Sequence, residues 1–396
     1  MSTFKILVLN QISQVGLKRL PHELYTVARE CAAPDAILLR SQDLHAMEIP
    51  ASVRAIGRAG AGTNNIPVGR MSERGVPVFN APGANANAVK ELVLAGMLMA
   101  ARNLPGALSF VGGLGGGHGD GEMDVLVESG KKNFAGSELA NHTLGVVGLG
   151  KIGCLVADAA IRLGMHVLGY DPEITVDAAW SLPSQVRKAQ SIEEVLKNCN
   201  FVTLHVPLAE MTRHLIRRQR VELMKQGAVL LNFSRDAVVD EEAVLHGLAT
   251  HRLKYYVCDF PSPRLAGHAG VIALPHLGAS TREAEENCAV MVVDQVRDYL
   301  EHGNIRNAVN FPDVTMSREV PYRVAIANAN VPNMLGQIST AMANAGLNIH
   351  NMMNKSRGEM AYTLVDVDSA AGANLIAALS AIQGVLSVRY LPAAGG

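Results

Sequence analysis

The stretch Gly145-Val146-Val147-Gly148-Leu149-Gly150-Lys151-Ile152-Gly153 decides the fold of this chain. It contains a GxGxxG pattern between an apolar strand, predicted over residues 144–147, and a helical pattern. In that context Gly148 permits a tight turn, Gly150 lets the backbone approach a pyrophosphate, and Gly153 allows the helix to pack closely on the strand. Unpaired amides at the start of the helix favour anionic oxygens. The stretch therefore predicts a dinucleotide-binding turn.

An acidic residue at the end of the next strand indicates which dinucleotide binds. Asp171 lies 18 residues after Gly153, directly after the strand predicted over 167–170. A carboxylate there accepts hydrogen bonds from the ribose hydroxyls of adenosine and repels a 2′-phosphate. NAD is therefore the predicted cofactor. A glycine turn followed by a capping aspartate is the alternative.

Around this stretch, apolar runs alternate with helical patterns, which predicts an α/β fold with parallel sheets. Six strand candidates suit a doubly wound sheet: 144–147, 167–170, 201–205, 228–232, 255–258 and 271–273. Four more precede them, at 5–9, 36–39, 55–56 and 76–78. A helix is predicted over 86–101, followed by a flexible glycine-rich excursion over 106–121.

Three domains are predicted. A long amphipathic helix over 280–302 can return the chain to the first strands, so the nucleotide domain is an insertion. The predicted divisions are a flavodoxin-like substrate-binding domain (1–100 and 280–311), a Rossmann-type NAD-binding domain (101–279) and a terminal domain (320–396) after a linker over 310–319. The terminal domain has the ferredoxin-like order βαββαβ. Its elements are predicted at 322–328, 333–345, 349–355, 360–367, 372–382 and 385–390.

Composition narrows the class of protein. The 396 residues include 35 Lys+Arg and 36 Asp+Glu, a net charge of -1 that favours neither nucleic acid nor an anionic membrane as a partner. No apolar run reaches the ~20 residues that span a bilayer. The start of the chain has no cleavage site of a signal peptide, so we expect a soluble, cytoplasmic protein. The five cysteines are scattered and never form CxxC, so we expect no disulfide scaffold and no metal.

Five motifs follow one another along the chain. They are Gly57-Arg58-Ala59-Gly60-Ala61-Gly62-Thr63-Asn64-Asn65, Asn80-Ala81-Pro82-Gly83-Ala84-Asn85, the glycine turn at 148–153, Asn232-Phe233-Ser234-Arg235, and Leu274-Pro275-His276-Leu277-Gly278-Ala279-Ser280-Thr281. Together they resemble the D-2-hydroxyacid dehydrogenases, up to about residue 310. The resemblance implies NAD-dependent hydride transfer from C2 of a small 2-hydroxy acid. The leading substrate is 3-phospho-D-glycerate, oxidised to 3-phosphonooxypyruvate in the first step of L-serine biosynthesis.

Two residues are expected to carry the chemistry. Oxidising an alcohol beside a carboxylate requires a base that titrates near neutral pH, and the motif around His276 makes that histidine the candidate. The substrate carboxylate needs a planar cation that can bind both oxygens, and Arg235 matches the family's substrate-binding arginine. Both residues are predicted just after strands of the nucleotide domain, where loops of such sheets bind ligands.

The same resemblance extends to residues around the two ligands. Cofactor contacts are expected from Gly148, Gly150, Lys151, Ile152, Gly153, Asp171, Val206, Pro207, Ser234, Asp259, Gly278 and Ala279. Substrate contacts are expected from Arg58, Ala59, Gly60, Asn85 and Lys132. For Lys132 and its neighbour Lys131, a solvated lysine pair is the alternative to phosphate binding.

One position departs from the family pattern. The family usually has a glutamate hydrogen-bonded to the catalytic histidine, shortly after the strand that ends in aspartate. In this chain that strand ends at Cys258-Asp259, and Arg264 occupies the place of the glutamate. An arginine beside the histidine would favour neutral imidazole over imidazolium. We therefore expect reduction of the keto acid to be impaired more than oxidation of the hydroxy acid.

The terminal domain resembles an ACT regulatory domain. The resemblance rests on Asn328-Ala329-Asn330-Val331-Pro332-Asn333-Met334-Leu335-Gly336 and Gly346-Leu347-Asn348-Ile349. It implies an effector site in which Asn328, Asn330 and Asn348 bind L-serine, with Asn328 in place of a histidine. Asparagine offers both a donor and an acceptor for such a ligand. A domain that pairs sheets and binds nothing is the alternative.

Two other functions remain open from the sequence. One is a reductase of the same family that acts on glyoxylate, hydroxypyruvate or 2-oxoglutarate, with 2-hydroxyglutarate as the product of the last. The other is a non-catalytic NAD-sensing corepressor on the same fold, which the missing glutamate favours and the presence of Arg235 and His276 opposes. The resemblance also implies dimerisation through the nucleotide domain, and a free ACT sheet edge can pair again. A homodimer or homotetramer is expected.

Overall fold

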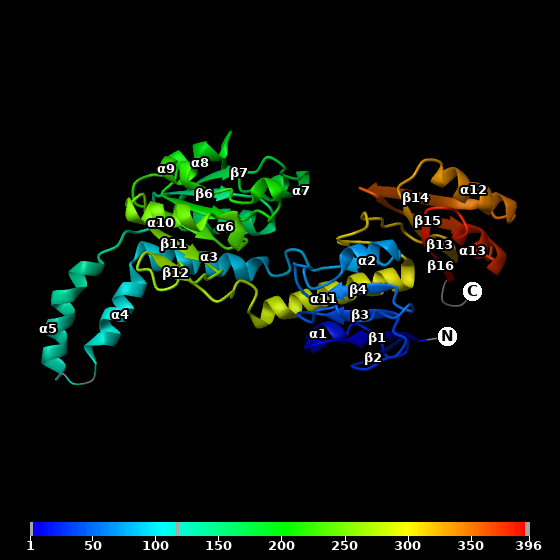
Figure 1. The fold of residues 1–396 in the computed structure, drawn as a ribbon, viewed down its shortest axis with the longest axis horizontal. Helices are drawn as coiled ribbons and strands as arrows, with labels where there is room; N and C mark the ends of the chain where they lie inside the picture. The colour runs from blue at the N-terminus through cyan, green and yellow to red at the C-terminus, as the bar shows by residue number, and fades with distance from the viewer. Residues whose placement is uncertain (1–2, 116, 118, 393–396) are drawn as a thin grey trace. The chain divides into compact units, whose positions relative to one another are not determined.

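The computed structural model of the chain describes residues 3–115, 117 and 119–392. They form two compact units (Figure 1): the first runs up to Asn85 and resumes at Arg282, and the second is Ala86–Thr281. The division falls at residue 85 and not at residue 100. The reason is that helix α3 (Ala86–Ala101) buries Val93 and Met97 in the core of the second unit.

The first sheet belongs to the first unit and is parallel. Its strands are β1 (Phe4–Val8), β2 (Tyr25–Ala28), β3 (Ala36–Leu39), β4 (Ala55–Arg58) and β5 (Val78–Phe79), in the order β2-β1-β3-β4-β5. This is the flavodoxin-like order that the sequence predicts. Helices α1 (Gln14–Leu17), α2 (Val68–Glu73) and α11 (Arg282–His302) accompany the sheet, and α11 contacts β4. The sequence did not indicate β2, because its middle residues are exposed and form no apolar run.

The second sheet belongs to the second unit and is also parallel. Its strands are β6 (Thr143–Val147), β7 (His166–Tyr170), β8 (Arg187–Lys188), β9 (Phe201–Leu204), β10 (Ala228–Asn232), β11 (Leu253–Cys258) and β12 (Val271–Ala273). The order β12-β11-β10-β9-β6-β7-β8 confirms the predicted doubly wound sheet, with β8 as a seventh, exposed strand. The strand order reverses between β6 and β9, and such a switch point is where these folds bind ligands. The helices are α6 (Lys151–Arg162), α7 (Val176–Ser181), α8 (Ile192–Asn198), α9 (Arg218–Leu223) and α10 (Glu241–Ala249), with 3-10 turns η2 (Glu210–Thr212) and η3 (Asp236–Val238).

The predicted flexible excursion over 106–121 is wrong for most of its length. Helix α4 (Leu104–Leu114) occupies its first part and α5 (Asp120–Gly130) begins before its end, followed by the 3-10 turn η1 (Lys131–Phe134); residues 116 and 118 lie outside the described residues. Both helices lead away from the second sheet (Figure 1), and α4 buries none of its side chains. The apolar residues of α4 recur at helical spacing, a signal that the surrounding glycines masked.

No single helix of the described residues is long and apolar enough to cross a membrane. Among the described helices, α3 and α4 taken together reach the required length and composition, and a bend of 67° separates them.

The third sheet forms the terminal domain. Strands β13 (Tyr322–Ala329), β14 (Ile349–Arg357), β15 (Met360–Val367) and β16 (Val385–Pro392) pair antiparallel in the order β14-β15-β13-β16, with helices α12 (Met334–Asn344) and α13 (Ala373–Ser380). The prediction of a ferredoxin-like unit is confirmed. One face of this sheet packs Val324 and Ile326 with the two helices, whereas the other packs Ala325, Tyr362 and Leu364 into the core of the first unit.

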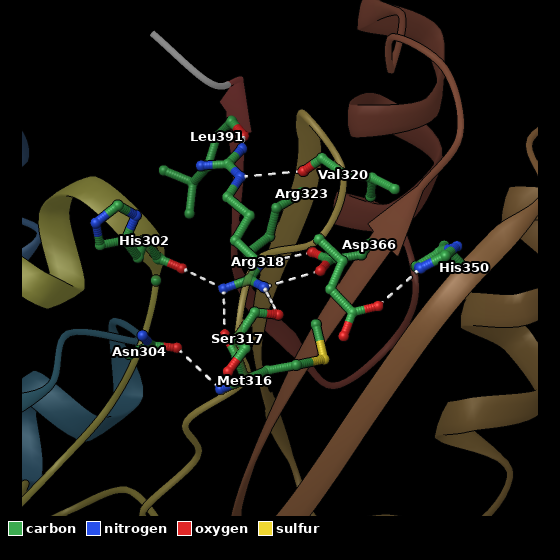
Figure 2. A network of polar contacts seen from close by, with 12 residues as sticks. His302, Asn304, Met316, Ser317, Arg318, Val320, Arg323, His350, Asp366 and Leu391 are labelled. Atoms are coloured by element: carbon green, nitrogen blue, oxygen red, sulfur yellow. Dashed lines mark hydrogen bonds and ion pairs between the residues drawn. The ribbon is translucent and has the colours of Figure 1, made fainter.

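A buried ion pair joins the two central strands of the third sheet. Arg323 of β13 and Asp366 of β15 are both fully buried, and the guanidinium binds both carboxylate oxygens, with Nε to Oδ1 at 2.6 Å and Nη2 to Oδ2 at 2.8 Å. The remaining guanidinium hydrogens are donated to the carbonyl oxygens of His302, Met316 and Ser317 (Figure 2). The charge therefore has a full set of partners in the interior, which a buried arginine needs.

The third sheet also supplies partners for the last turn of α11. Arg389 of β16 donates to the carbonyl oxygens of Tyr299 and Leu300, at 3.1 and 2.9 Å, and its guanidinium lies over the Tyr299 ring. The Tyr362 hydroxyl of β15 donates to the carbonyl oxygen of Gly303 at 2.7 Å. The last carbonyls of a helix have no partner within the helix. Arg323, Tyr362 and Arg389 of the terminal domain therefore supply the hydrogen-bond donors for the carbonyls at the end of α11.

Candidate active site

The glycine turn lies at the end of β6. Gly148 has φ +91°, and a β-carbon there would lie 2.5 Å from the carbonyl oxygen of His205. A β-carbon at Gly153 would overlap the carbonyl oxygen of Gly148, whereas one at Gly150 would meet nothing within 4 Å. The turn is therefore closed against the protein and open on its outer side, at the start of α6, where Lys151 and Ile152 begin the helix. This open cradle of backbone amides fits the pyrophosphate of a dinucleotide.

Asp171 lies beside this turn. Its Oδ2 accepts a hydrogen bond from the Leu149 amide at 2.8 Å, and its Oδ1 accepts one from the Glu173 amide at 2.9 Å. The carboxylate is thus fixed at the end of β7 next to the cradle. That is the place from which an acid can bind the hydroxyls of an adenosine ribose.

The loops after β9 and β10 continue the same edge of the second sheet. Val206, half-buried, and Pro207, exposed, follow β9. Ser234 follows β10, and its hydroxyl donates to the carbonyl oxygen of Leu204 at 2.5 Å. Strand β9 pairs with β6, the strand that leads into the glycine turn, and β10 pairs with the other side of β9, so these residues follow the first and second strands beside β6.

His276 lies in the loop after β12 and has φ +56°, a left-handed conformation that is uncommon for histidine. Its amide donates to the carbonyl oxygen of Asp259 at 3.1 Å, which holds the backbone in this turn. The imidazole is exposed and meets the ring of Phe260 edge-on, with ring centroids 5.0 Å apart. Within the part of the chain that the structure describes, neither ring nitrogen has a hydrogen-bond partner, so the ring is available to a ligand.

Asp259 braces the histidine turn. Its side chain is 2% exposed, and its two carboxylate oxygens accept hydrogen bonds from the amides of Leu277 and Gly278, each at 2.7 Å. A β-carbon at Gly278 would lie 3.0 Å from the nearer oxygen, so glycine lets the turn approach the carboxylate closely. Ala279 follows, half-buried. The carboxylate that we expected to contact the cofactor therefore also anchors the loop of His276.

Arg235 lies at the same edge of the second sheet as His276. It follows β10, and β11 separates that strand from β12. The side chain is exposed, and its Nη1 donates to the carbonyl oxygen of Ser234 at 2.7 Å. The guanidinium of Arg235 and the imidazole of His276 thus belong to loops that follow two strands with one strand between them.

The predicted influence of Arg264 on the histidine needs correction. Arg264 forms an exposed ion pair with Glu242, with Nη2 and Oε1 2.5 Å apart, and this hydrogen bond raises the pKa of Arg264. The described residues contain no hydrogen bond or ion pair between Arg264 and His276. Glu242, at the start of α10, therefore offsets the charge that we expected to act on the imidazole.

The residues predicted to bind the substrate from the first unit lie at the carboxyl ends of β4 and β5. Arg58 ends β4, and its Nε donates to the carbonyl oxygen of Arg40 at 3.1 Å. A β-carbon at Gly60 would lie 2.5 Å from Nη1 of Arg58, so glycine leaves room for the guanidinium. Ala59 is buried, and Asn85 precedes α3. The glycine of this motif therefore leaves space for the guanidinium of Arg58.

Lys132 lies in the other unit, on the exposed turn η1. Its neighbour Lys131 is ion-paired with Glu128, which favours the solvated lysine pair for that residue.

The three asparagines of the terminal domain do not form one site within a chain. Asn328, the residue before the last of β13, is buried, and its Nδ2 donates to the Ala329 carbonyl oxygen at 2.7 Å. Asn330 follows two residues later. Asn348 precedes β14, and the register pairs Ile349 with Val367 at the far end of the sheet from Asn328. Eight strand residues, about 25 Å, separate the two ends. The three asparagines therefore do not meet within one chain, and the effector site that they were expected to form stays a prediction.

Comparisons with known proteins identify the family. Residues 95–278 match the model of the D-isomer specific 2-hydroxyacid dehydrogenase NAD-binding domain. The chain is 32% identical to the D-3-phosphoglycerate dehydrogenase of Haemophilus influenzae over 351 residues, which cover 85% of this chain and 81% of that protein. The chain belongs to the D-3-phosphoglycerate dehydrogenase family. It is also 35% identical to the D-3-phosphoglycerate dehydrogenase of Methanocaldococcus jannaschii over 324 residues, 80% of this chain but only 57% of that protein's length.

Solved structures share the fold of the chain. The NAD+-bound 3-phosphoglycerate dehydrogenase of Entamoeba histolytica has a TM-score of 0.58 and 24% identity, covering 78% of this chain and 99% of that chain. The TT0316 protein of Thermus thermophilus has a TM-score of 0.62 and 26% identity, covering 77% of this chain and all of that chain. The chain is thus a member of an oxidoreductase family and carries its NAD-binding domain.

Three residues near the site of this D-3-phosphoglycerate dehydrogenase family member were not singled out from the sequence. Phe260 contacts the imidazole of His276. Asn232 and Tyr256 hydrogen-bond to each other beneath the loop of Arg235. A signal existed for Asn232, because an amide at the end of a buried apolar strand must find partners. The ring of Tyr256 lies two residues before the end of β11, and nothing local indicates which neighbouring loop its hydroxyl reaches.

Proposed function

We propose that this chain oxidises 3-phospho-D-glycerate to 3-phosphonooxypyruvate with NAD, the first step of L-serine biosynthesis. The observation that supports the proposal most is that an exposed imidazole, His276, and an exposed guanidinium, Arg235, end nearby strands at the edge that carries the open glycine cradle. These are the base and the carboxylate-binding group that oxidation of a 2-hydroxy acid requires.

In this proposal each residue has a defined task. Arg235 binds the substrate carboxylate and so orients C2, and a ring nitrogen of His276 takes the proton of the C2 hydroxyl. A bound NAD would supply the hydride acceptor for C2. Asp171 selects NAD by its carboxylate, and Asp259 holds the turn of His276. Arg58, placed on the first sheet, is the proposed ligand of the substrate phosphate.

The proposal is tested by turnover. Purified protein with NAD and 3-phosphoglycerate should produce NADH, with slower reaction on glyoxylate, hydroxypyruvate or 2-oxoglutarate in the reverse direction and little activity with the phosphorylated cofactor. Preference for one of those keto acids would assign the chain to another reductase of the family. Tight NAD binding without any turnover would instead favour a non-catalytic sensor.

We also propose that the chain assembles and responds to L-serine. The exposed apolar residues of the arm formed by α4 and α5, among them Leu108 at 69% and Val125 at 68%, favour dimerisation through this arm. Strand β14 is an edge strand, and a two-fold pairing of β14 with its copy would bring Asn348 of one chain toward Asn328 and Asn330 of the other. The NADH assay repeated with L-serine tests the effector, since inhibition requires a ligand that distinguishes two states.

Replacing Arg264 by glutamate should raise the rate of keto-acid reduction relative to hydroxy-acid oxidation by about ten-fold, the effect of one pKa unit. The family pattern has a glutamate at this place that hydrogen-bonds to the histidine, and such a carboxylate favours the imidazolium, which donates the proton in reduction. Initial rates in both directions at one pH measure this ratio. The control is E242Q, which breaks the same ion pair without adding a carboxylate near His276. Equal ratios in the two variants would assign any change to loss of the pair alone.

A further inference from the structure

The loop that presents Arg235 is fastened to the second sheet by one buried amide. Asn232, the last residue of β10, is fully buried. Its Nδ2 donates to the carbonyl oxygen of Arg235 at 2.8 Å, and its Oδ1 accepts from the amide of Ser234 at 3.1 Å. One side chain thus binds a donor and an acceptor on the backbone of the turn, and this fixes the direction in which the chain leaves the strand.

A second buried group holds Asn232 in place. Tyr256 lies on the neighbouring strand β11, is 4% exposed, and accepts a second hydrogen bond from Nδ2 of Asn232 at its hydroxyl, at 3.3 Å. Burial raises the pKa of Tyr256, so the hydroxyl stays neutral in the working range of an enzyme. The ring packs in the core between the second sheet and its helices. The position of the amide is therefore set by a rigid side chain anchored in the core.

The guanidinium of Arg235 is the exposed end of this arrangement. It is exposed, and the only hydrogen bond recorded for it in the described residues is from Nη1 to the carbonyl oxygen of Ser234. The peptide groups on both sides of Ser234 are thus bound, one by Asn232 and the other by the arginine. A cation on a long side chain binds a carboxylate well only when its backbone is fixed, because misplacement lowers the population that meets the substrate.

We propose that Asn232, held by Tyr256, is a positioning residue that sets Arg235 for binding the substrate carboxylate. The proposal rests on the role of Arg235 in the proposed function. It assigns no contact with substrate to either residue. Tyr256 and Asn232 act through the backbone of residues 232–235, so loss of either should weaken substrate binding and leave cofactor binding unchanged.

The mildest test removes one oxygen atom. Y256F should raise KM for 3-phosphoglycerate by about three- to ten-fold, the effect of one hydrogen bond, and leave KM for NAD unchanged. N232A should raise KM for 3-phosphoglycerate further, because it frees both backbone groups of the turn. The matched control is Y255F, the same change one residue earlier on β11, where the hydroxyl has no hydrogen bond recorded in the described part of the chain.

A double-mutant cycle separates positioning from general loss of structure. In an R235K background, Y256F should have little further effect on KM, because the group that it positions is already replaced. An equal effect of Y256F with and without R235K, or no change of KM in Y256F, would overturn the proposal. If R235K itself left KM for the substrate unchanged, the proposed function of Arg235 would fail instead. Should N232A not fold, Y256F alone still decides.

Discussion

H276N should lower kcat for 3-phosphoglycerate oxidation by about 10²–10⁴-fold, the range expected when a general base is removed. Asparagine is the best substitute because the residue at this position has φ +56°, and asparagine tolerates left-handed backbone better than most residues. The turn held by Asp259 should therefore persist. Affinity for NAD should change little, since the cradle lies on a different loop.

Steady-state oxidation rates and NAD titration measure the two effects of H276N separately. The control is H268N, a histidine of the preceding loop whose Nδ1 accepts a hydrogen bond from the Gly270 amide, which asparagine can also accept. H268N should retain activity close to that of the unaltered protein. Retained activity in H276N would mean that another group takes the proton, and the assignment of the base would fall.

D366N should destabilise the third sheet by about 3–5 kcal/mol, because it leaves the fully buried guanidinium of Arg323 without its counter-charge. Asparagine keeps the size of the side chain, so the effect reports the charge and not a cavity. The double variant R323M/D366L should recover part of this loss, because apolar residues of similar volume can replace a buried pair. Recovery should be incomplete, since the carbonyl oxygens of His302, Met316 and Ser317 also lose their donor.

Hydrogen exchange of the β13 and β15 amides measures this stability locally. Exchange of the β6 and β9 amides of the second sheet is the internal control, which D366N should leave unchanged. The exposed pair of Arg162 and Asp158 provides the matched surface variant, D158N, which should leave exchange of the third sheet unaltered. Unchanged exchange in D366N would show that the buried pair adds nothing to the stability of the sheet.

The strands that the sequence predicted well are those buried on both faces. The strand β3 is apolar and fully buried throughout, so its run of hydrophobic residues sufficed. Strand β8 was not predicted because both of its residues are charged and exposed, and β2 was not predicted because its middle residues, Thr26 and Val27, are exposed and form no apolar run. The helices α4 and α5 were not predicted for a different reason. Their apolar residues remain exposed, and the glycines among them favour a loop.

Local motifs also located the candidate site, because each candidate follows a strand whose end the sequence marks. His276 and Arg235 come directly after apolar runs, and parallel strands bring such ends to one edge. Pairings between distant segments could not be found in the same way. The partner of Arg264 is Glu242 on a helix 22 residues away, and no local pattern distinguishes it from the nearby acids.

The hydrogen bonds at the end of α11 bear on how separable the terminal domain is. A chain cut after residue 311 would keep both parallel sheets, yet the carbonyls of Tyr299, Leu300, His302 and Gly303 would lose the donors that β13, β15 and β16 supply. The apolar face around Tyr362 and Leu364 would leave a bare patch on the first unit. The terminal domain is a separate module in the sequence, but its stability and that of the first unit depend on each other. Grafting the terminal domain onto another chain would therefore require transfer of α11 as well.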